Sequence, residues 1–253
     1  LGTALLPVGT TPDEVELIFD QIAEACDALG ITMIGGHTEM TLDLPRPIIS
    51  GTMLGEVEKG KEVMTAGARP GDRVILTKGI AIEGTSLLAR EMRPQLKRAG
   101  VSASVLDRAA DYLYEPGISV VPEARAAHAA SGVTSMHDPT EGGLATALSE
   151  VSAASNTGML INRDNVPILP EAAELCDALS VDPWGLIASG ALLITAAPDS
   201  AAGVIDAVTG TGSPAVDIGE VRPAEDGLKL VSGGQELPFP IFERDEIARV
   251  LGA

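Results

Sequence analysis

Short apolar runs alternate with amphipathic helical patterns along nearly the whole chain, and this alternation limits the possible folds more than any other feature. Residues 10–30, TTPDEVELIFDQIAEACDALG, show how sharply the pattern is delimited. Thr11 is the expected N-cap, Glu14 completes its capping box, and Gly30 ends the helix. A strand-like run precedes this helix, and the run ITMI at residues 31–34 predicts a short buried strand after it. Strands and helices in alternation predict a fold of α/β or α+β layers.

The same alternation continues toward the C-terminal end. Further strands are predicted at residues 47–57, 73–76, 133–136, 158–161, 191–196 and 215–221. Further helices are predicted at residues 84–92, 104–114, 120–131, 143–155, 170–179 and 200–208. The charged, glycine-containing stretch EKGKEV interrupts the pattern, so we expect a domain boundary between residues 60 and 66. The expected domains are residues 1–63 and 64–253.

The composition narrows the class of protein. The chain has 253 residues, 45% of them hydrophobic, and is long enough to bury a core. A formal net charge of −19 repels a phosphate backbone, which argues against nucleic acid as a partner. Apolar stretches such as GLIASGALLITAA are too short and too glycine-rich to span a bilayer, and no signal peptide is visible. We therefore expect a cytoplasmic protein without a membrane partner, in which Cys26 and Cys176 are small core residues.

The first residues of the sequence lead to a further expectation. The chain opens LGTALLPVGT, with no methionine and with what resembles the second half of an apolar strand. We expect that a further segment precedes Leu1 in the natural protein, and that the N-terminal domain is truncated in this sequence.

Three polar, glycine-bearing segments each follow a predicted strand. They are GGHTEM at residues 35–40, TKGIAIEGTS at 77–86 and HDPTEGG at 137–143. Strand exits are where α/β proteins build ligand sites, and free backbone amides at a helix start bind anions. Carboxylates beside such a cradle are explained if Mg²⁺ bridges them to a phosphate. Together the three segments favour a site for phosphate and magnesium.

Each segment also has a purely structural interpretation. Two glycines at 35 and 36 form a turn, and His37 with Glu39 forms a surface pair. Lys78 is a solvated side chain, and the acids of residues 138–141 cap the helix that follows them. The residues alone leave both interpretations open. The sequence contains no P-loop, no nucleophile elbow and no zinc-ligand spacing.

Taken together, these segments resemble a known family. The stretches IGGHTEM, PGDRVILTKGIAIEGTSLLA, HDPTEGGLATALSEVSAASNTGMLI and DPWGLIASGALLIT are similar to the aminoimidazole-ribonucleotide-synthetase-like (PurM-like) ATP-binding superfamily. The resemblance covers nearly the whole chain, residues 1–245. It is strongest to the HypE-related hydrogenase maturation branch, whose members carry a D-P-T-x-G-G-L-A turn.

The resemblance implies a two-domain PurM-like fold in a homodimer. The N-terminal domain would pair with its dimer mate, and the C-terminal domain would be an α/β layer. ATP would bind at the junction of the domains, with Mg²⁺ between acidic side chains and the phosphates. The shared chemistry is ATP-driven: a phosphoryl group passes to an oxygen or selenium nucleophile, or activates an amide-type oxygen for dehydration.

The resemblance also implies roles for particular residues. The catalytic residues would be His37, Lys78 and Asp138. The nucleotide and phosphates would be bound by Gly35, Gly36, His37, Thr38, Glu39, Thr140, Gly142 and Gly143. The acceptor side would be lined by Lys78, Gly79, Glu83, Gly84 and Thr85. The metal ligands would be Glu39 and Asp138.

The sequence departs from the family pattern at three places. No counterpart of the aspartate-rich N-terminal strand is present, and His37 stands where the family more often has an acid. HypE proteins end in a cysteine that carries the thiocarbamoyl group, whereas this sequence ends RDEIARVLGA.

The function implied is that of a Mg-ATP-dependent enzyme acting on a small-molecule or carrier-bound acceptor, with hydrogenase metal-centre maturation as one setting. Two alternatives stay open. One is a small-molecule kinase or ATP-dependent cyclo-ligase, similar to thiamine-monophosphate kinase or the purine synthetase. The other is a non-catalytic dimeric scaffold that has lost the ATP-site aspartates.

Overall fold

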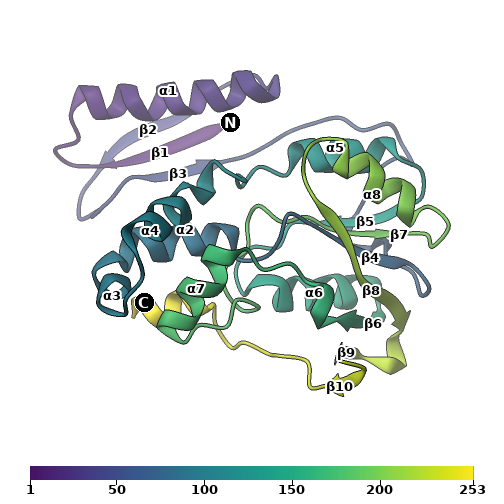
Figure 1. Cartoon of the computed structure of the whole chain (residues 1–253). Helices are drawn as coiled ribbons and strands as arrows, with labels where there is room; N and C mark the ends of the chain where they lie inside the picture. Colours follow the sequence, from purple (N-terminus) through teal and green to yellow (C-terminus); the bar gives the residue numbers. More distant parts are fainter. Residues whose placement is uncertain (253) are drawn as a thin grey trace. The chain divides into compact units, whose positions relative to one another are not determined.

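The computed structural model describes residues 1–252 and has the mixed α/β architecture expected from the alternating pattern (Figure 1). The chain divides into two compact units, Leu1–Glu62 (unit 1) and the residues from Val63 onward (unit 2). No helix in residues 1–252 is both long enough and apolar enough to cross a membrane.

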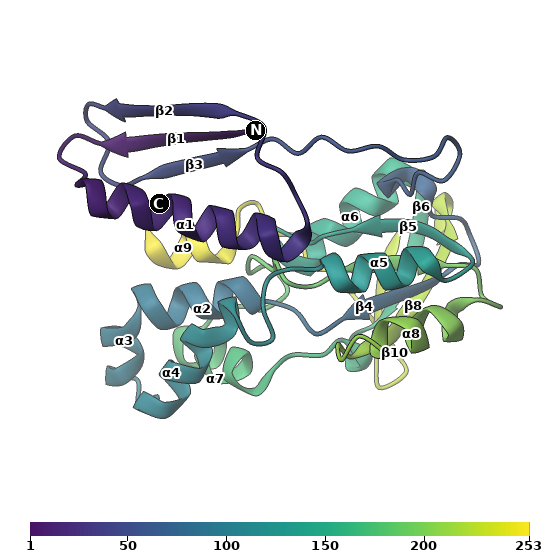
Figure 2. The ribbon, with the colours of Figure 1, turned by 90° about the horizontal axis from the view of Figure 1, so that it is seen from above.

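Unit 1 is a three-stranded sheet with one long helix. Its elements are β1 (Gly2–Pro7), α1 (Pro12–Leu29), β2 (Gly36–Thr41) and β3 (Ile48–Gly51). The strand order is β2-β1-β3, with β1 parallel to β2 and antiparallel to β3 (Figure 2). The predicted capping box of α1 is confirmed: the Thr11 amide donates to Glu14 at 2.7 Å, and the Glu14 amide donates to the Thr11 hydroxyl at 3.4 Å. Gly30 ends the helix in the left-handed conformation, as expected.

The second strand of unit 1 lies later than the sequence pattern indicated. Residues 31–35 are not a strand, whereas GHTEMT, expected as a loop, forms β2. Pairing with β1 explains the difference, because Gly36 lies opposite Gly2 in the parallel register. A Cβ atom at position 36 would lie 1.8 Å from the Gly2 carbonyl oxygen, so only glycine permits this approach.

Unit 1 buries little of its apolar surface. Ala4 and Leu6 of β1 are buried, but α1 has no buried residue. A cavity of about 620 Å³ lies beside the C-terminal part of α1, and half-buried Cys26 lines it. The prediction that Cys26 is a core residue is therefore wrong: the apolar stripe of α1 does not close onto a full core within unit 1.

Unit 2 contains a seven-stranded sheet and eight α-helices among its described residues. Its strands are β4 (Arg73–Thr77), β5 (Val133–His137), β6 (Thr157–Asn162), β7 (Leu193–Ala196), β8 (Ala215–Pro223), β9 (Leu228–Ser232) and β10 (Gln235–Leu237). Its helices are α2 (Ile82–Glu91), α3 (Arg93–Arg98), α4 (Ala103–Ala110), α5 (Val121–Ala129), α6 (Gly143–Ser155), α7 (Pro170–Leu179), α8 (Ala201–Thr209) and α9 (Glu246–Leu251). Short 3₁₀ turns occupy Thr65–Gly67, Asp111–Leu113, Arg163–Asn165 and Ala224–Asp226.

The sheet of unit 2 has the order β10-β9-β6-β8-β4-β7-β5. Its strand pairs are antiparallel, apart from the parallel pair β6–β9. Helix α6 covers one face, whereas α5 and α8 cover the other (Figure 1). The predicted apolar face of α6 is confirmed, since Leu144, Leu148 and Val151 are buried against the sheet.

Helices α2, α4 and α7 form a separate apolar cluster in unit 2, which includes Cys176 of α7. The prediction that Cys176 is a core residue is confirmed, because its side chain is buried. Burial raises the pKa of the Cys176 thiol to about 12, and nearby carboxylates such as Asp177 add to this effect. The thiol is therefore neutral and packs as an apolar group.

Candidate functional site

Two of the three glycine-bearing segments reach the same end of the unit 2 sheet. Strands β4 and β5 both pair antiparallel with β7, so they run in the same direction on either side of it. Leu193, the first residue of β7, pairs with Leu76 near the end of β4 and with His137 at the end of β5. The segments that follow β4 and β5 therefore leave the sheet together, beside the segment that enters β7. We call this place the site end.

A third segment at the site end, residues 182–190 (DPWGLIASG), lies between the starts of α2 and α6. The amides of Glu83 and Gly84 donate to the carbonyls of Ser189 and Ile187, at 3.3 and 3.1 Å. On the other side, the Ala145 amide donates to the Trp184 carbonyl at 3.1 Å, and the Ala188 amide donates to the Thr140 carbonyl at 3.2 Å. The 182–190 segment thus joins the two helix starts. No role at the site was expected for this segment, although its Asp-Pro-x-Gly spacing is a turn signal.

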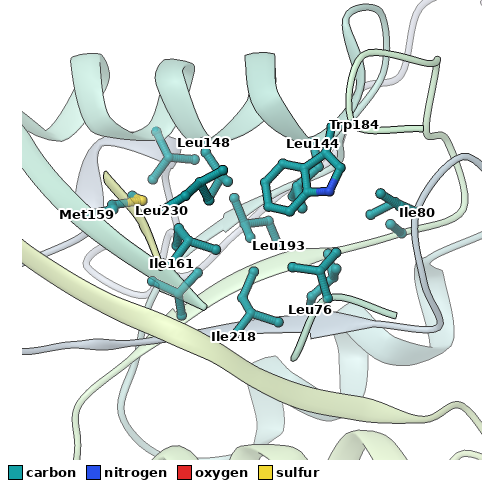
Figure 3. Close-up of a cluster of buried hydrophobic side chains, with 14 of the residues drawn as sticks. Leu76, Ile80, Leu144, Leu148, Met159, Ile161, Trp184, Leu193, Ile218 and Leu230 are labelled. Atoms are coloured by element: carbon teal, nitrogen blue, oxygen red, sulfur yellow. The ribbon is translucent and has the colours of Figure 1, made fainter. Parts of the chain in front are cut away.

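Apolar side chains from all these segments anchor the site end in one core cluster. Trp184 is 1% exposed and packs with Ile80, Leu144 and Leu193, which come from the β4–α2 loop, the start of α6 and the start of β7. Figure 3 shows Trp184 beside Leu144 within this cluster. Because each segment contributes a buried side chain, the loops have a fixed base beneath their polar residues.

The glycines of the two helix starts provide room for the 182–190 segment. A Cβ atom on Gly84 would lie 2.4 Å from the Leu186 side chain and 2.9 Å from the Ile187 carbonyl oxygen. A Cβ atom on Gly143 would lie 2.5 Å from the Trp184 carbonyl oxygen. Gly143 also has φ of 64°, which favours glycine. Close packing therefore explains both glycines without a ligand.

The amides at the start of α6 are already engaged within the chain. The Gly142 amide donates to Oδ2 of Asp245 at 2.6 Å, and the Gly143 amide donates to the Thr140 carbonyl at 3.1 Å. The expectation that this helix start offers free amides to a phosphate is therefore wrong for Gly142 and Gly143. The competing acceptors come from the turn itself and from a carboxylate about a hundred residues away, which sequence spacing does not reveal.

Some side chains of the 137–143 segment contact other residues of unit 2, and others have no partner among the described residues. Nε2 of His137 lies 2.8 Å from Glu150, and its Nδ1 lies 3.4 Å from the Thr65 hydroxyl. Asp138 and Thr140 are exposed, and their side chains have no hydrogen bond or ion pair within residues 1–252. The Asp138 carboxylate is therefore available to a ligand.

Lys78 is buried within unit 2. Its ammonium is 3.0 Å from Oε1 of Glu123 and donates to the carbonyls of Gly117 and Ser119 at 3.1 and 2.6 Å. Three acceptors occupy its three N–H groups. The expectation that Lys78 is available to neutralise charge on an acceptor is therefore not met in this geometry, because Glu123 already balances that charge.

The other residues expected on the acceptor side are also packed inside, with one exception. Gly79 and Gly84 are buried, and Thr85 is buried with its hydroxyl donating to the Ala81 carbonyl at 2.6 Å. Glu83 is only half-buried, and its carboxylate has no partner within residues 1–252. The β4–α2 segment thus presents Glu83, rather than Lys78, as its free charged group.

In unit 1 the segment Gly35–Glu39 lies mainly on the outer strand β2. His37 and Glu39 project from the same face, with Nε2 of His37 3.3 Å from Oε2 of Glu39, and both are exposed. Thr38 pairs with Ala4 and so projects from the opposite face of the sheet. No cluster of three or more His, Cys, Asp or Glu side chains that would bind a metal ion by themselves occurs in residues 1–252.

Comparison with known proteins identifies the family. Residues 3–57 match the N-terminal domain of AIR synthase related proteins, and residues 69–230 match their C-terminal domain. The chain therefore belongs to the AIR synthase related family, whose PurM-like fold the sequence resemblance implied.

Within this family the chain is similar to hydrogenase maturation proteins. It is 30% identical to carbamoyl dehydratase HypE of Cupriavidus necator over 233 residues, and this match covers 90% of this chain and 62% of that protein. The chain thus spans less than two thirds of this curated relative. The crystal structure of E. coli HypE shares the fold, with a TM-score of 0.78 at 20% identity, over 96% of this chain and 73% of that one. A HypE structure in complex with ATP also shares the fold, with a TM-score of 0.72 at 19% identity, over 97% and 74% of the two chains.

Proposed function

We propose that this protein is a Mg-ATP-dependent enzyme that transfers a phosphoryl group to, or uses one to activate, a small-molecule or carrier-bound acceptor. Family membership and the similarity to proteins named carbamoyl dehydratase support this class of reaction. The observation that carries the proposal is the site end, where two helix starts meet beside the free carboxylate of Asp138. Maturation of a hydrogenase-type metal centre is the setting that the relatives favour.

The donor chemistry at the site end fits magnesium. Mg²⁺ prefers oxygen ligands and is usually held by one or two carboxylates together with the phosphates of the substrate. Asp138 offers such a carboxylate, and the absence of a larger acidic cluster in residues 1–252 agrees with a metal that arrives with the nucleotide. Bound there, Mg²⁺ would neutralise charge that develops on the transferred phosphoryl group.

The protein's own part in the reaction would be binding and orientation. The starts of α2 and α6 point their positive helix ends toward the site end, which favours an anionic ligand even where the amides are engaged. The exposed hydroxyl of Thr140 is a hydrogen-bond donor for a phosphate oxygen. In unit 1, we assign His37 and Glu39 of β2 to phosphate and metal contacts, because both side chains are exposed and share one face.

Replacement of Asp138 by asparagine tests the proposal directly. We expect the wild-type chain to bind a non-hydrolysable ATP analogue only in the presence of Mg²⁺, and the D138N variant to bind it at least about tenfold more weakly. The fold should be unaffected, because Asp138 is exposed and has no partner within the described chain. Calorimetric titration with and without Mg²⁺ measures both effects.

Glu141→Gln is the matched control, since it removes one exposed charge from the same turn. Equal losses in the two variants would mean that only the local potential matters and that Asp138 is not a ligand. No binding by a folded wild-type chain would contradict an ATP-dependent function for this chain and favour the scaffold alternative.

We also propose that the protein is a homodimer that associates through unit 1. Thirteen of the nineteen large apolar side chains that are exposed in residues 1–252 belong to unit 1, including Ile34, Met40, Leu42 and Leu54. Exposed apolar surface on this scale marks an interaction face. Sedimentation equilibrium should give twice the mass of one chain, and replacement of Met40 by glutamate should shift the equilibrium to the monomer. A monomer at all protein concentrations would contradict the dimer.

A further inference from the structure

The carboxylate of Asp245 holds together three segments of unit 2. Its Oδ2 accepts the Gly142 amide at 2.6 Å, at the start of α6. Its Oδ1 accepts the amides of Ile187 at 3.3 Å and of Ile247 at 2.7 Å. One half-buried side chain therefore joins the turn before α6, the 182–190 segment and the first turn of α9.

The segment that carries Asp245 is itself well attached. The Glu246 amide donates to the Gly185 carbonyl at 3.0 Å, and the Glu246 carboxylate accepts the Asp182 amide at 3.3 Å. Arg249 donates to the Ser180 carbonyl at 2.8 Å, and Ile247 packs against the apolar cluster of α2, α4 and α7. These contacts fix the position of the Asp245 carboxylate independently of its bond to Gly142.

The turn that Asp245 contacts has little conformational preference of its own. Gly142 and Gly143 both occupy the left-handed region, with φ of 76° and 64°. Glycine adopts this region freely but does not favour it over other conformations, so two glycines in a row leave the turn underdetermined. The Thr140 carbonyl holds one side of the turn by accepting the amides of Gly143 and Ala188. The Asp245 carboxylate holds the Gly142 amide on the other side, and the resulting conformation sets the direction in which Asp138 and Thr140 are presented.

We propose that Asp245 is a positioning residue for the ligand-facing turn of residues 138–143. It would not touch the nucleotide; it would hold the Gly142 amide, and through it the turn that presents Asp138. The consequence for nucleotide binding rests on the proposed function, whereas the effect on the turn does not. A residue in the C-terminal segment thereby controls the precision of a site formed more than a hundred residues earlier in the chain.

The test is the isosteric variant Asp245→Asn. The side-chain amide keeps one oxygen acceptor but faces at least one backbone amide with an N–H group, so it cannot satisfy all three donors. We expect hydrogen exchange in residues 139–145 to accelerate at least about tenfold, because a bond to a charged acceptor is lost. Affinity for the Mg²⁺-bound ATP analogue should fall about tenfold, as it does when the group that orients a metal ligand is removed.

Two matched variants separate positioning from other effects. Glu243→Gln removes one exposed charge two residues away and should change neither readout. Glu246→Gln weakens the attachment of the same segment without touching Gly142, and should leave exchange in residues 139–145 near the wild-type rate. Equal acceleration in the Glu246 variant would overturn the specific role of Asp245.

The remaining outcomes are distinguishable. Unchanged exchange in the turn of the Asp245 variant overturns the proposal, whatever the nucleotide does. Higher affinity for the ATP analogue also overturns it, since the carboxylate would then compete with phosphate. If the wild-type chain binds no nucleotide while exchange still accelerates in the variant, the proposed function fails and the positioning of the turn stands.

Discussion

Replacement of Gly143 by alanine is expected to destabilise unit 2 by roughly 3 kcal/mol, from overpacking of about 1–3 kcal/mol and a left-handed backbone cost of about 1–2 kcal/mol. The new Cβ atom would lie 2.5 Å from the Trp184 carbonyl oxygen and 2.7 Å from that of Leu186. These are backbone atoms of a segment anchored by a buried tryptophan, so they cannot move aside cheaply. Urea unfolding of the whole chain measures the loss.

Gly203→Ala is the matched control for this prediction. Gly203 lies in α8, its added Cβ would meet no atom within 4 Å, and its backbone is not left-handed. Alanine there should be neutral or stabilise by up to about 1 kcal/mol. If Gly143→Ala instead left stability unchanged and weakened nucleotide binding, the result would contradict the packing role. It would support the phosphate-binding role that the family resemblance implies for Gly143.

The fold was largely predictable because most elements carry their own local signals. Thr11, Glu14 and Gly30 delimit α1, and the apolar spacing of Leu144, Leu148 and Val151 defines the inner face of α6. The failures lie where pairing outweighs local pattern. Residues 36–41 contain polar side chains and begin with the second of two neighbouring glycines, yet they form β2 because β1 offers a partner strand. Strands β9 and β10 and helices α3 and α9 also lacked a pattern strong enough to be predicted.

The candidate site was less predictable than the fold. Two of the segments predicted at strand exits do meet, because β7 lies antiparallel between β4 and β5. Residues 182–190 were not expected at the site because they read as an apolar run, and their backbone groups make the hydrogen bonds to the two helix starts. Polar side chains and the amides at the start of α6 were also expected to be free. Burial and long-range partners, such as Glu123 for Lys78 and Asp245 for Gly142, are absent from local sequence.

The second large effect concerns Lys78. Replacement of Lys78 by methionine is expected to cost about 3–5 kcal/mol of folding free energy, because it leaves a buried carboxylate without its cation. The Lys78 and Glu123 side chains are 4% and 1% exposed, and Oε2 of Glu123 already has no hydrogen-bond partner. Without Lys78, the Ser213 hydroxyl would be the remaining donor to Glu123. Position 78 has φ of 56°, a left-handed conformation that is unfavourable for any non-glycine residue. Lysine and methionine both bear this cost, so the comparison isolates the effect of the charge.

The double variant K78M/E123L shows whether the pair, rather than the lysine alone, determines the loss. Removing both charges eliminates the unpaired carboxylate, and apolar replacements of buried ion pairs are often neutral or stabilising. We therefore expect the double variant to recover most of the stability lost in K78M, as measured by urea unfolding of both proteins. A K78M protein as stable as the wild type would contradict the buried pair. It would indicate that the Lys78 ammonium of the wild type is available to an acceptor. A double variant no better than K78M would mean that the bonds to Gly117 and Ser119, which fix the loop before α5, matter more than the charge.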